Sequence, residues 1–285
     1  MTCIQIVDIV TPRKFVLNGL LMGPERPKRI IVWVHGMFAS VFSMRHVVER
    51  LIDDETAVLT FNNRGYQSVS SVKQYAKIKP KSVRAGTAHE VFTDCEDDIE
   101  GAVRFAKKTG AKEIYVAGHS TGCQKAVYWA YKKNPTIRGI ILLAPMSDYA
   151  SIQKHNHYRA ALRSAKALIQ AGKPHVLLSD DAWNHDVDAQ RFISLYTPDS
   201  IEQSIFPYFD AARRASTFAR VRLPTLVILA EDDEYADRPM QRVAEWFGNA
   251  RKNTHVSMLV KATHNFKGAE RELAKTITNW ISLKK

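Results

Sequence analysis

The stretch Val116-Ala117-Gly118-His119-Ser120-Thr121-Gly122 decides the fold that this sequence predicts. The residues that lead into it, Lys112–Ala117, form a short apolar and β-branched run that is typical of a buried parallel strand. The residues that follow, Cys123–Tyr131, have helical spacing. A G-x-S-x-G sequence between a strand and a helix indicates a sharp turn with an exposed serine hydroxyl. We therefore expect Ser120 to lie in a strained turn above a helix N-terminus.

Strand-like and helix-like segments alternate on both sides of this turn. Strands are predicted at Cys3–Val10, Lys14–Met22, Arg29–Val34, Thr56–Phe61, Glu113–Ala117, Gly139–Ala144, Pro224–Ala230 and His255–Val260. Helices are predicted at Ser43–Ile52, Glu90–Lys108, Gly122–Lys132, Met240–Phe247 and Ala269–Leu283. The first two strands should form an antiparallel hairpin, and Gln67–Ala88 should be a long loop. This alternation predicts an α/β fold with a mostly parallel sheet and helices on both faces.

The alternation stops between Ser147 and Ser216. This segment has helical stretches at Tyr158–Ala171, Ala189–Leu195 and Ser200–Phe209, and no convincing buried strand. We expect it to form an α-helical cap, inserted after the sixth predicted strand and above the strand ends where such sheets bind ligands. The predicted domains are a core of residues 1–146 and 217–285 and a helical cap of residues 147–216.

The composition is that of an ordinary globular protein. The chain has 285 residues, of which 45% are hydrophobic and 25% charged. It has no apolar run of membrane-spanning length, and we expect no secretory leader, because the first residues lack a basic segment and include Asp8. Its three cysteines, Cys3, Cys95 and Cys123, lack the spacing of a metal site and suit a reducing compartment. We therefore expect a cytoplasmic protein with no membrane partner and no metal.

The net charge of +12 is concentrated outside the predicted cap, whose basic and acidic residues balance. The stretch between Thr56 and His89 contains no acidic residue and holds one basic cluster. The members of this cluster are Arg64, Lys73, Lys77, Lys79, Lys81 and Arg84. A solvated surface is the simplest interpretation, and recruitment of a negatively charged substrate by Lys73–Arg84 is the alternative. Aromatic residues do not alternate with the basic ones as they do in nucleic-acid grooves, so we expect no nucleic-acid partner.

Two further residues complete a candidate nucleophilic site with Ser120. A serine hydroxyl needs a base, and His264 follows the last predicted strand, at the same edge of the sheet as Ser120. The base needs an acid that fixes its tautomer, and an acidic run, 231–234, follows the strand Pro224–Ala230. Asp233 is the preferred acid, with Asp232 and Asp148 as alternatives.

The same edge offers backbone donors for an oxyanion. One donor should be the N–H group of Thr121, directly after the nucleophile. The other should be the N–H group of Met37, because His35-Gly36-Met37 lies at the end of the strand Arg29–Val34. We expect these two amides to form an oxyanion hole.

These motifs together resemble the α/β-hydrolase superfamily along nearly the whole chain. A closer likeness, to the family that includes the fungal siderophore esterases, rests on Gly118–Gln124, Ala144–Asp148 and Asp233–Tyr235. The resemblance implies the catalytic triad Ser120, Asp233 and His264. It does not transfer a substrate, because the cap sets specificity.

The sequence thus predicts a serine hydrolase that cleaves a small-molecule carboxylic ester through an acyl-enzyme, without a cofactor. Acyl transfer, thioester or amide cleavage and carbon–carbon bond hydrolysis use the same triad and remain alternatives. A non-catalytic binding protein on the same fold is the alternative of a different class.

Overall fold

The computed structural model describes residues 3–153, 155–179, 183 and 186–283; Lys154, Asp180, Asp181 and His185 of the predicted cap lie outside these ranges. The described strands are β1 (Cys3–Val10), β2 (Phe15–Gly23), β3 (Arg29–Val34), β4 (Thr56–Phe61), β5 (Ser70–Gln74), β6 (Lys81–Ala85), β7 (Glu113–His119), β8 (Gly139–Leu143), β9 (Thr225–Ala230) and β10 (Thr254–Leu259). The described helices are α1 (Arg45–Val48), α2 (Cys95–Lys108), α3 (Thr121–Lys133), α4 (Asp148–Ile152), α5 (Tyr158–Gln170), α6 (Ala189–Tyr196), α7 (Ser216–Ala219), α8 (Met240–Ala250) and α9 (Glu270–Ser282). No helix among these residues is both long enough and apolar enough to span a membrane.

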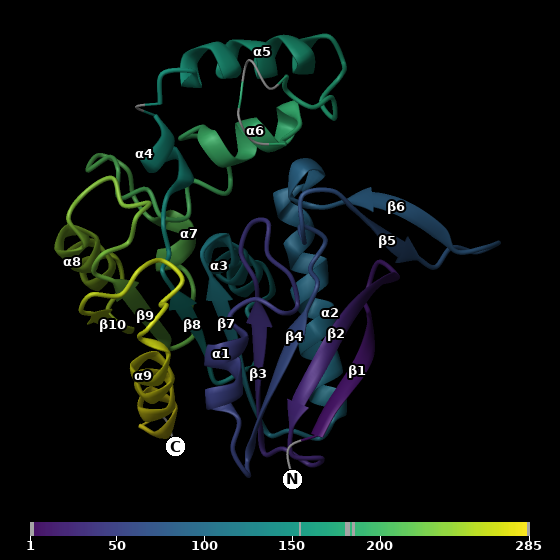
Figure 1. Ribbon diagram of the computed structural model, residues 1–285, viewed down its shortest axis with the longest axis vertical. Helices are drawn as coiled ribbons and strands as arrows, with labels where there is room; N and C mark the ends of the chain where they lie inside the picture. Colours follow the sequence, from purple (N-terminus) through teal and green to yellow (C-terminus); the bar gives the residue numbers. More distant parts are fainter. Residues whose placement is uncertain (1–2, 154, 180–182, 184–185, 284–285) are drawn as a thin grey trace.

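The strands form one sheet in the order β10-β9-β8-β7-β3-β4-β2-β5-β6, with β1 paired to β2 (Figure 1). Neighbours from β10 to β4 pair in parallel, whereas β2 pairs antiparallel with β4, β1 and β5. All residues of β3, β4, β7, β8 and β9 are buried, as parallel strands covered on both faces should be. The mostly parallel sheet and the first hairpin are therefore confirmed.

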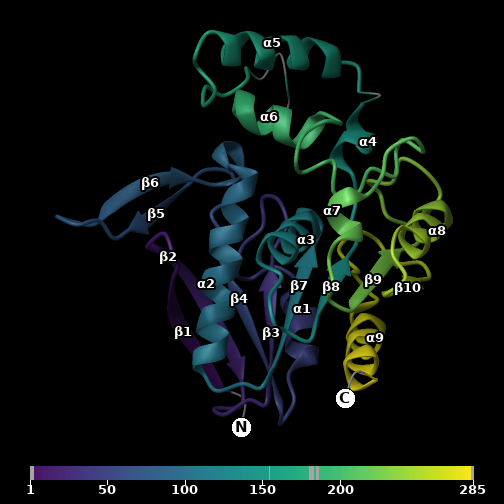
Figure 2. The same cartoon turned by 180° about the vertical axis from the view of Figure 1, so that it is seen from behind.

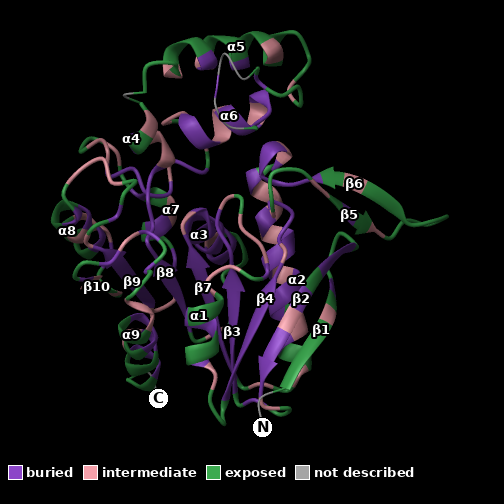
Figure 3. Cartoon of the chain, viewed as in Figure 1, coloured by how far each residue is buried: buried purple, intermediate pink, exposed green. Residues whose placement is uncertain are grey.

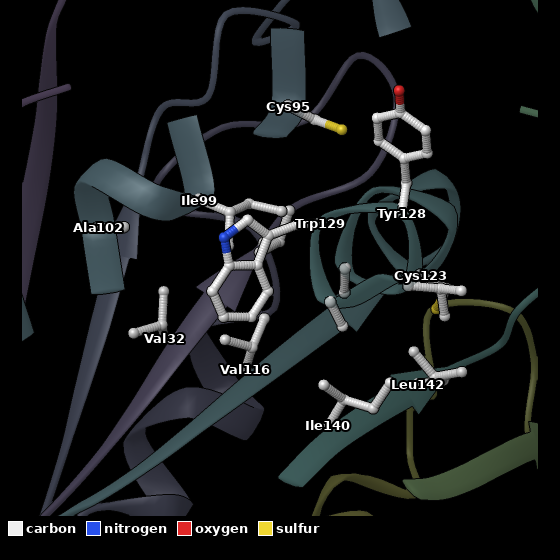
Figure 4. Packing of buried hydrophobic residues seen from close by; sticks show 14 of the residues in the cluster. Val32, Cys95, Ile99, Ala102, Val116, Cys123, Tyr128, Trp129, Ile140 and Leu142 are labelled. Atoms are coloured by element: carbon white, nitrogen blue, oxygen red, sulfur yellow. The ribbon is translucent and has the colours of Figure 1, made fainter. Parts of the chain in front are cut away.

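Alternate side chains of the central strands enter two separate hydrophobic cores. In β3, Val32 and Val34 pack on the face covered by α2, α3 and α8, whereas Ile31 and Trp33 pack on the face of α1 and α9. Figure 2 shows α2 and α3 on the first face, and Figure 4 shows Trp129 of α3 packed there near Val32. Each large apolar side chain buried in this way contributes about 1.5–3 kcal/mol. The two cores hold the carboxyl ends of the parallel strands together at one edge.

Helices α5 and α6 lie beyond this edge (Figures 1 and 2). They enclose a third hydrophobic cluster, which includes Ala161, Ala165 and Phe192. Farther along the predicted cap, Ile205 and Phe206 instead belong to the core on the face of α2, α3 and α8. The limits that we predict for the core and cap domains stay a prediction.

The prediction of a long loop at Gln67–Ala88 is wrong, because β5 and β6 form an antiparallel pair there. Their residues are mostly polar and mostly exposed (Figure 3). Val72 and Ala85 are buried and Val83 is half-buried, so the sequence carries little strand signal. The insertion consequently follows β8, the eighth strand, rather than a sixth.

Two helix predictions also need correction. Ser200–Phe209 forms turns rather than a helix, since Pro207 has no N–H group to donate and its ring obstructs the preceding turn. The helix predicted at Glu90–Lys108 begins only at Cys95, after two short 3₁₀ segments, Thr87–His89 and Phe92–Asp94. Glu90 is held outside α2 by its buried ion pairs, described below.

Candidate active site

Ser120 occupies a sharp turn between β7 and α3. Its backbone has a positive φ, with φ 54° and ψ −127°, a region where residues other than glycine are strained. A Cβ atom on Gly118 would collide with the carbonyl oxygen of Gly122, and one on Gly122 with that of Val34. The two glycines of the motif therefore permit the close approach of helix and strand that this turn requires.

His264 and Asp233 follow the neighbouring strands β10 and β9 and contact each other. Nδ1 of His264 lies 2.8 Å from Oδ2 of Asp233, and both side chains are buried. The other oxygen, Oδ1, accepts a hydrogen bond of 3.0 Å from the N–H group of Tyr235. Because a carboxylate can only accept, Nδ1 carries the proton and Nε2 keeps its lone pair. The imidazole is thereby held in the tautomer that a general base requires.

The two alternative acids lie elsewhere. Asp232 is exposed, and its N–H group bonds to the carbonyl oxygen of Ala262. Asp148 accepts a 3.3 Å hydrogen bond at Oδ2 from Nε2 of Gln203. Desolvation, together with the nearby carboxylate of Glu202, raises the pKa of Asp148 to about 6. Of the three candidates, Asp233 is the one hydrogen-bonded to His264.

A cavity of about 970 Å³ opens beside Ser120 and His264. Its other lining residues give it an apolar wall with exposed aromatic groups at the rim, and Asp148 and Lys267 add charge. The apolar and aromatic members are Met37, Phe38, Phe42, Met44, Met146 and Tyr235. This combination suits a substrate with an apolar part and a polar group.

The loop after β3 places backbone donors next to Ser120. A Cβ atom on Gly36 would lie 2.8 Å from Cβ of Ser120, which shows how closely this loop approaches the serine. The N–H group of Asn63 donates to Nε2 of His35, at 3.2 Å, so the proton of His35 is on Nδ1. That proton is donated to the carbonyl oxygen of Gly36, at 2.8 Å.

This contact orients the peptide that carries the N–H group of Met37. In a trans peptide the C=O and N–H bonds point in opposite directions, and the described chain has no cis peptide. With the Gly36 carbonyl held by His35, the N–H group of Met37 points away from His35. Burial and the positive charge of Lys125 lower the pKa of His35 to about 3, so the ring remains neutral and keeps both hydrogen bonds at neutral pH.

A second buried histidine, His119, supports the loop of His264. Its Nε2 lies 3.0 Å from the carbonyl oxygen of His264, to which it must donate, and the two rings are 5.1 Å apart. Burial, together with the proximity of His264, lowers the pKa of His119 from 6.5 to about 4. His119 is therefore neutral in the folded protein.

Because His119 is neutral in the folded protein, lowering the pH should reduce the free energy of unfolding. Between pH 6.5 and 4 the unfolded chain binds a proton at residue 119 that the folded protein does not, so stability falls as the pH falls. From pH 7 to pH 5 the wild type should lose about 2 kcal/mol of unfolding free energy relative to His119→Gln. Urea unfolding at both pH values measures this difference. His255→Gln, at an exposed histidine, should track the wild type, and a pH-independent difference for His119→Gln would contradict a neutral His119.

A chain of buried charges connects the cap to the loop below Ser120. Arg191 of α6 lies 2.8 Å from Glu90 and 2.5 Å from Glu202. Glu90 in turn lies 2.5 Å from Lys125 of α3, whose Nζ donates to Oδ1 of Asn63 at 3.3 Å. The Arg191 and Lys125 side chains are fully buried, and these positive neighbours lower the pKa of Glu90 despite its burial. Through Asn63, the chain reaches His35 and the peptide of Met37.

Sequence reasoning missed the residues of this chain. The available signal was weak: Lys125 is a charged residue within the otherwise mainly apolar helical stretch after Ser120. The basic cluster also needs correction, because Arg64 is buried and paired with Asp94, Asp97 and Asp98 rather than exposed. Among the described residues, no three histidine, cysteine or carboxylate groups gather in a way that suits a metal ion.

Solved structures with this architecture match the chain along nearly its whole length. The siderophore hydrolase EstB from Aspergillus fumigatus has a TM-score of 0.69 at 14% identity, and the match covers 98% of each chain. Est1E from Butyrivibrio proteoclasticus, solved with ferulic acid bound, has a TM-score of 0.64 at 17% identity, again over 98% of each chain. Dienelactone hydrolase from Anabaena variabilis has a TM-score of 0.58 at 15% identity, over 99% of this chain and 97% of the other. The fold is that of the α/β-hydrolases, and the structural likeness to a siderophore hydrolase is confirmed.

Within this class, the chain belongs to the family described as protein of unknown function DUF1749, whose model matches residues 68–282. The uncharacterized protein YnbC of Escherichia coli strain K12 is 27% identical over 121 residues. That match covers 41% of this chain and only 18% of YnbC.

Proposed function

We propose that this protein is a serine hydrolase that cleaves carboxylic esters of small molecules. The observation that carries the proposal is the hydrogen bond between Asp233 and His264 in a cavity shared with Ser120. The strained turn of Ser120 supports it, as does the likeness of the fold to EstB, described as a siderophore hydrolase, and to Est1E. A protein that only binds its ligand has no need of this combination.

In the proposed reaction, Oγ of Ser120 attacks the ester carbonyl carbon while Nε2 of His264 takes the hydroxyl proton. Asp233 stabilises the resulting imidazolium, and the N–H groups of Met37 and Thr121 donate to the oxyanion. The tetrahedral intermediate collapses, and the leaving alkoxide takes the proton from His264. Water then attacks the acyl-enzyme by the same steps in reverse, which releases the acid and restores Ser120.

A fluorophosphonate probe tests the proposal directly, since it reacts only with an activated serine. We expect one modified peptide, with the label on Ser120, together with release of p-nitrophenol from p-nitrophenyl butyrate. Pretreatment with the probe should abolish that release. Folded protein that neither reacts with the probe nor cleaves any member of a panel of acyl and aromatic esters would overturn the proposal. Added alcohols that divert the acyl group would instead favour acyl transfer.

Gly36→Ala should impair turnover strongly. The new Cβ atom would lie 2.8 Å from Cβ of Ser120 and 3.0 Å from the carbonyl oxygen of His119, so the loop with the Met37 amide must shift. A displacement of about 1 Å at a reacting centre costs on the order of a hundredfold in rate, and we expect kcat to fall about 10- to 100-fold. Gly248→Ala is the matched control, since nothing lies within 4 Å of the added methyl group there. Equal kcat values for the two variants would argue against the role of this loop.

A further inference from the structure

The hairpin of β5 and β6 projects from the body of the protein as an arm, residues 70–85 (Figures 1 and 2). It joins the main sheet at the end of β5 that lies next to the hairpin turn, where Lys73 and Gln74 pair with Val16 and Phe15 of β2 and the N–H group of Tyr75 donates to the carbonyl oxygen of Lys14. Beyond this pairing, the residues of the turn, 75–80, are exposed. Val72 and Ala85 pack against the body of the protein, whereas the turn presents its side chains to whatever approaches this side of the molecule.

The arm carries five cations without carboxylate partners. No ion pair among the described residues includes any of them, although several other surface cations are paired, such as Arg13 with Asp94 and Lys133 with Glu96. The five cations are Lys73, Lys77, Lys79, Lys81 and Arg84. The nearest acidic residues in sequence, Glu55 and Glu90, lie well outside the arm. This positive charge is left available for a negatively charged partner.

An apolar side chain occupies the tip between two of these cations. Ile78 is 98% exposed and lies between Lys77 and Lys79. An isoleucine at the outermost point of a basic hairpin gains nothing from the fold. It gains free energy only when a partner takes it out of water. The partner must therefore offer negative charge at its surface and apolar material just below.

The arm and the candidate active site lie at the same end of the sheet. β2 runs antiparallel to β4, and the arm joins β2 near its first residues, so it lies at the carboxyl ends of the parallel strands. No residue of the arm is among those that line the cavity beside Ser120. Recognition of an anionic substrate inside that cavity therefore does not explain the arm.

We propose that the arm docks on an anionic lipid bilayer, with its lysines and Arg84 among the headgroups and Ile78 inserted below them. This departs from the expectation of no membrane partner and holds whether or not Ser120 is catalytic. A nucleic acid fits less well, because Tyr75 is the arm's one aromatic residue and Lys73 covers its ring at 4.8 Å. Docking would turn the cavity end of the protein toward the bilayer.

Sedimentation of the whole protein with vesicles tests this proposal. Vesicles containing about one-third phosphatidylserine should bind it, and pure phosphatidylcholine vesicles should not. Replacing Lys77, Lys79 and Lys81 with glutamine should lower the partition coefficient about a hundredfold, and raised salt should weaken binding of the wild type. The matched control replaces Lys107, Lys108 and Lys112, exposed lysines at the opposite end of the sheet, and should change binding no more than a few-fold.

A second variant tests insertion of the tip. Ile78→Trp adds a fluorophore at an exposed position, and its emission should shift to the blue only with anionic vesicles. The proposal is overturned by equal binding to both vesicle types, by a Lys77/Lys79/Lys81 variant that binds like the wild type, or by bound Ile78→Trp protein whose emission does not shift. Arm-dependent binding of duplex RNA or single-stranded DNA without vesicle binding would also overturn it, in favour of a nucleic-acid partner.

Discussion

Replacing Ser120 with alanine should lower kcat for p-nitrophenyl butyrate by at least about 10⁴-fold, equivalent to about 5.5 kcal/mol of transition-state stabilisation. The variant lacks the oxygen that attacks the carbonyl carbon, so an acyl-enzyme cannot form. Binding and the two backbone donors remain and should leave only a small residual rate. Steady-state kinetics, with circular dichroism as the check on folding, measures the effect.

The fold should tolerate this change, because alanine retains the Cβ atom and removes only a hydroxyl that faces the cavity. Ser204→Ala is a suitable control, since Ser204 bonds to the carbonyl oxygen of Ile201 outside the cavity and its loss should leave kcat unchanged. A Ser120→Ala protein that retains more than a tenth of the wild-type rate would refute the nucleophile assignment.

Asp233→Asn should lower kcat by about 10³- to 10⁴-fold while the protein stays folded. The asparagine oxygen can still accept from the N–H group of Tyr235, which leaves the amide NH₂ facing Nδ1 of His264. Because the amide NH₂ donates, Nδ1 must accept, and the proton of the imidazole moves to Nε2. His264 then has no lone pair for the hydroxyl proton of Ser120.

Two matched variants distinguish Asp233 from the alternative acids. Asp232→Asn changes an exposed carboxylate and should alter kcat less than about threefold. Asp148→Asn removes a carboxyl group that lines the cavity without touching Nδ1, so it should change KM for charged esters more than kcat. The assignment fails if Asp233→Asn keeps its rate while one of these two variants loses it.

The fold class and the candidate site are predictable because their signals are local. Ser120 directly follows β7, Asp233 and His264 lie in the loops that follow β9 and β10, and parallel strands end at one edge of a sheet. The three strand ends were thus enough to predict that these distant side chains lie near one edge of the sheet, where His264 and Asp233 are hydrogen-bonded and His264 and Ser120 line one cavity. Gly118 and Gly122 likewise predicted the sharp turn from local sequence alone, because only glycine fits at these two positions.

The features that escaped prediction depend on partners far away in the sequence. Glu90, Lys125 and Arg191 are separated by tens of residues, and each taken alone resembles a surface charge. The arm of β5 and β6 escaped because its strands bury little, and a mostly polar pattern predicts a loop. The turns at Ser200–Phe209 were missed because apolar spacing was given more weight than Pro207.

The buried ion pairs of Glu90 with Arg191 and with Lys125 bear on how this family can diversify. Loss of one partner from a buried ion pair costs about 3–5 kcal/mol, a large share of the stability of a typical domain. A chimaera that received another protein's cap without an arginine at this position would leave Glu90 in the interior with only one of its two positive partners, Lys125. Substrate range should therefore evolve by single exchanges of aliphatic and aromatic residues around the cavity. The cap itself should be inherited together with the core that it is paired to.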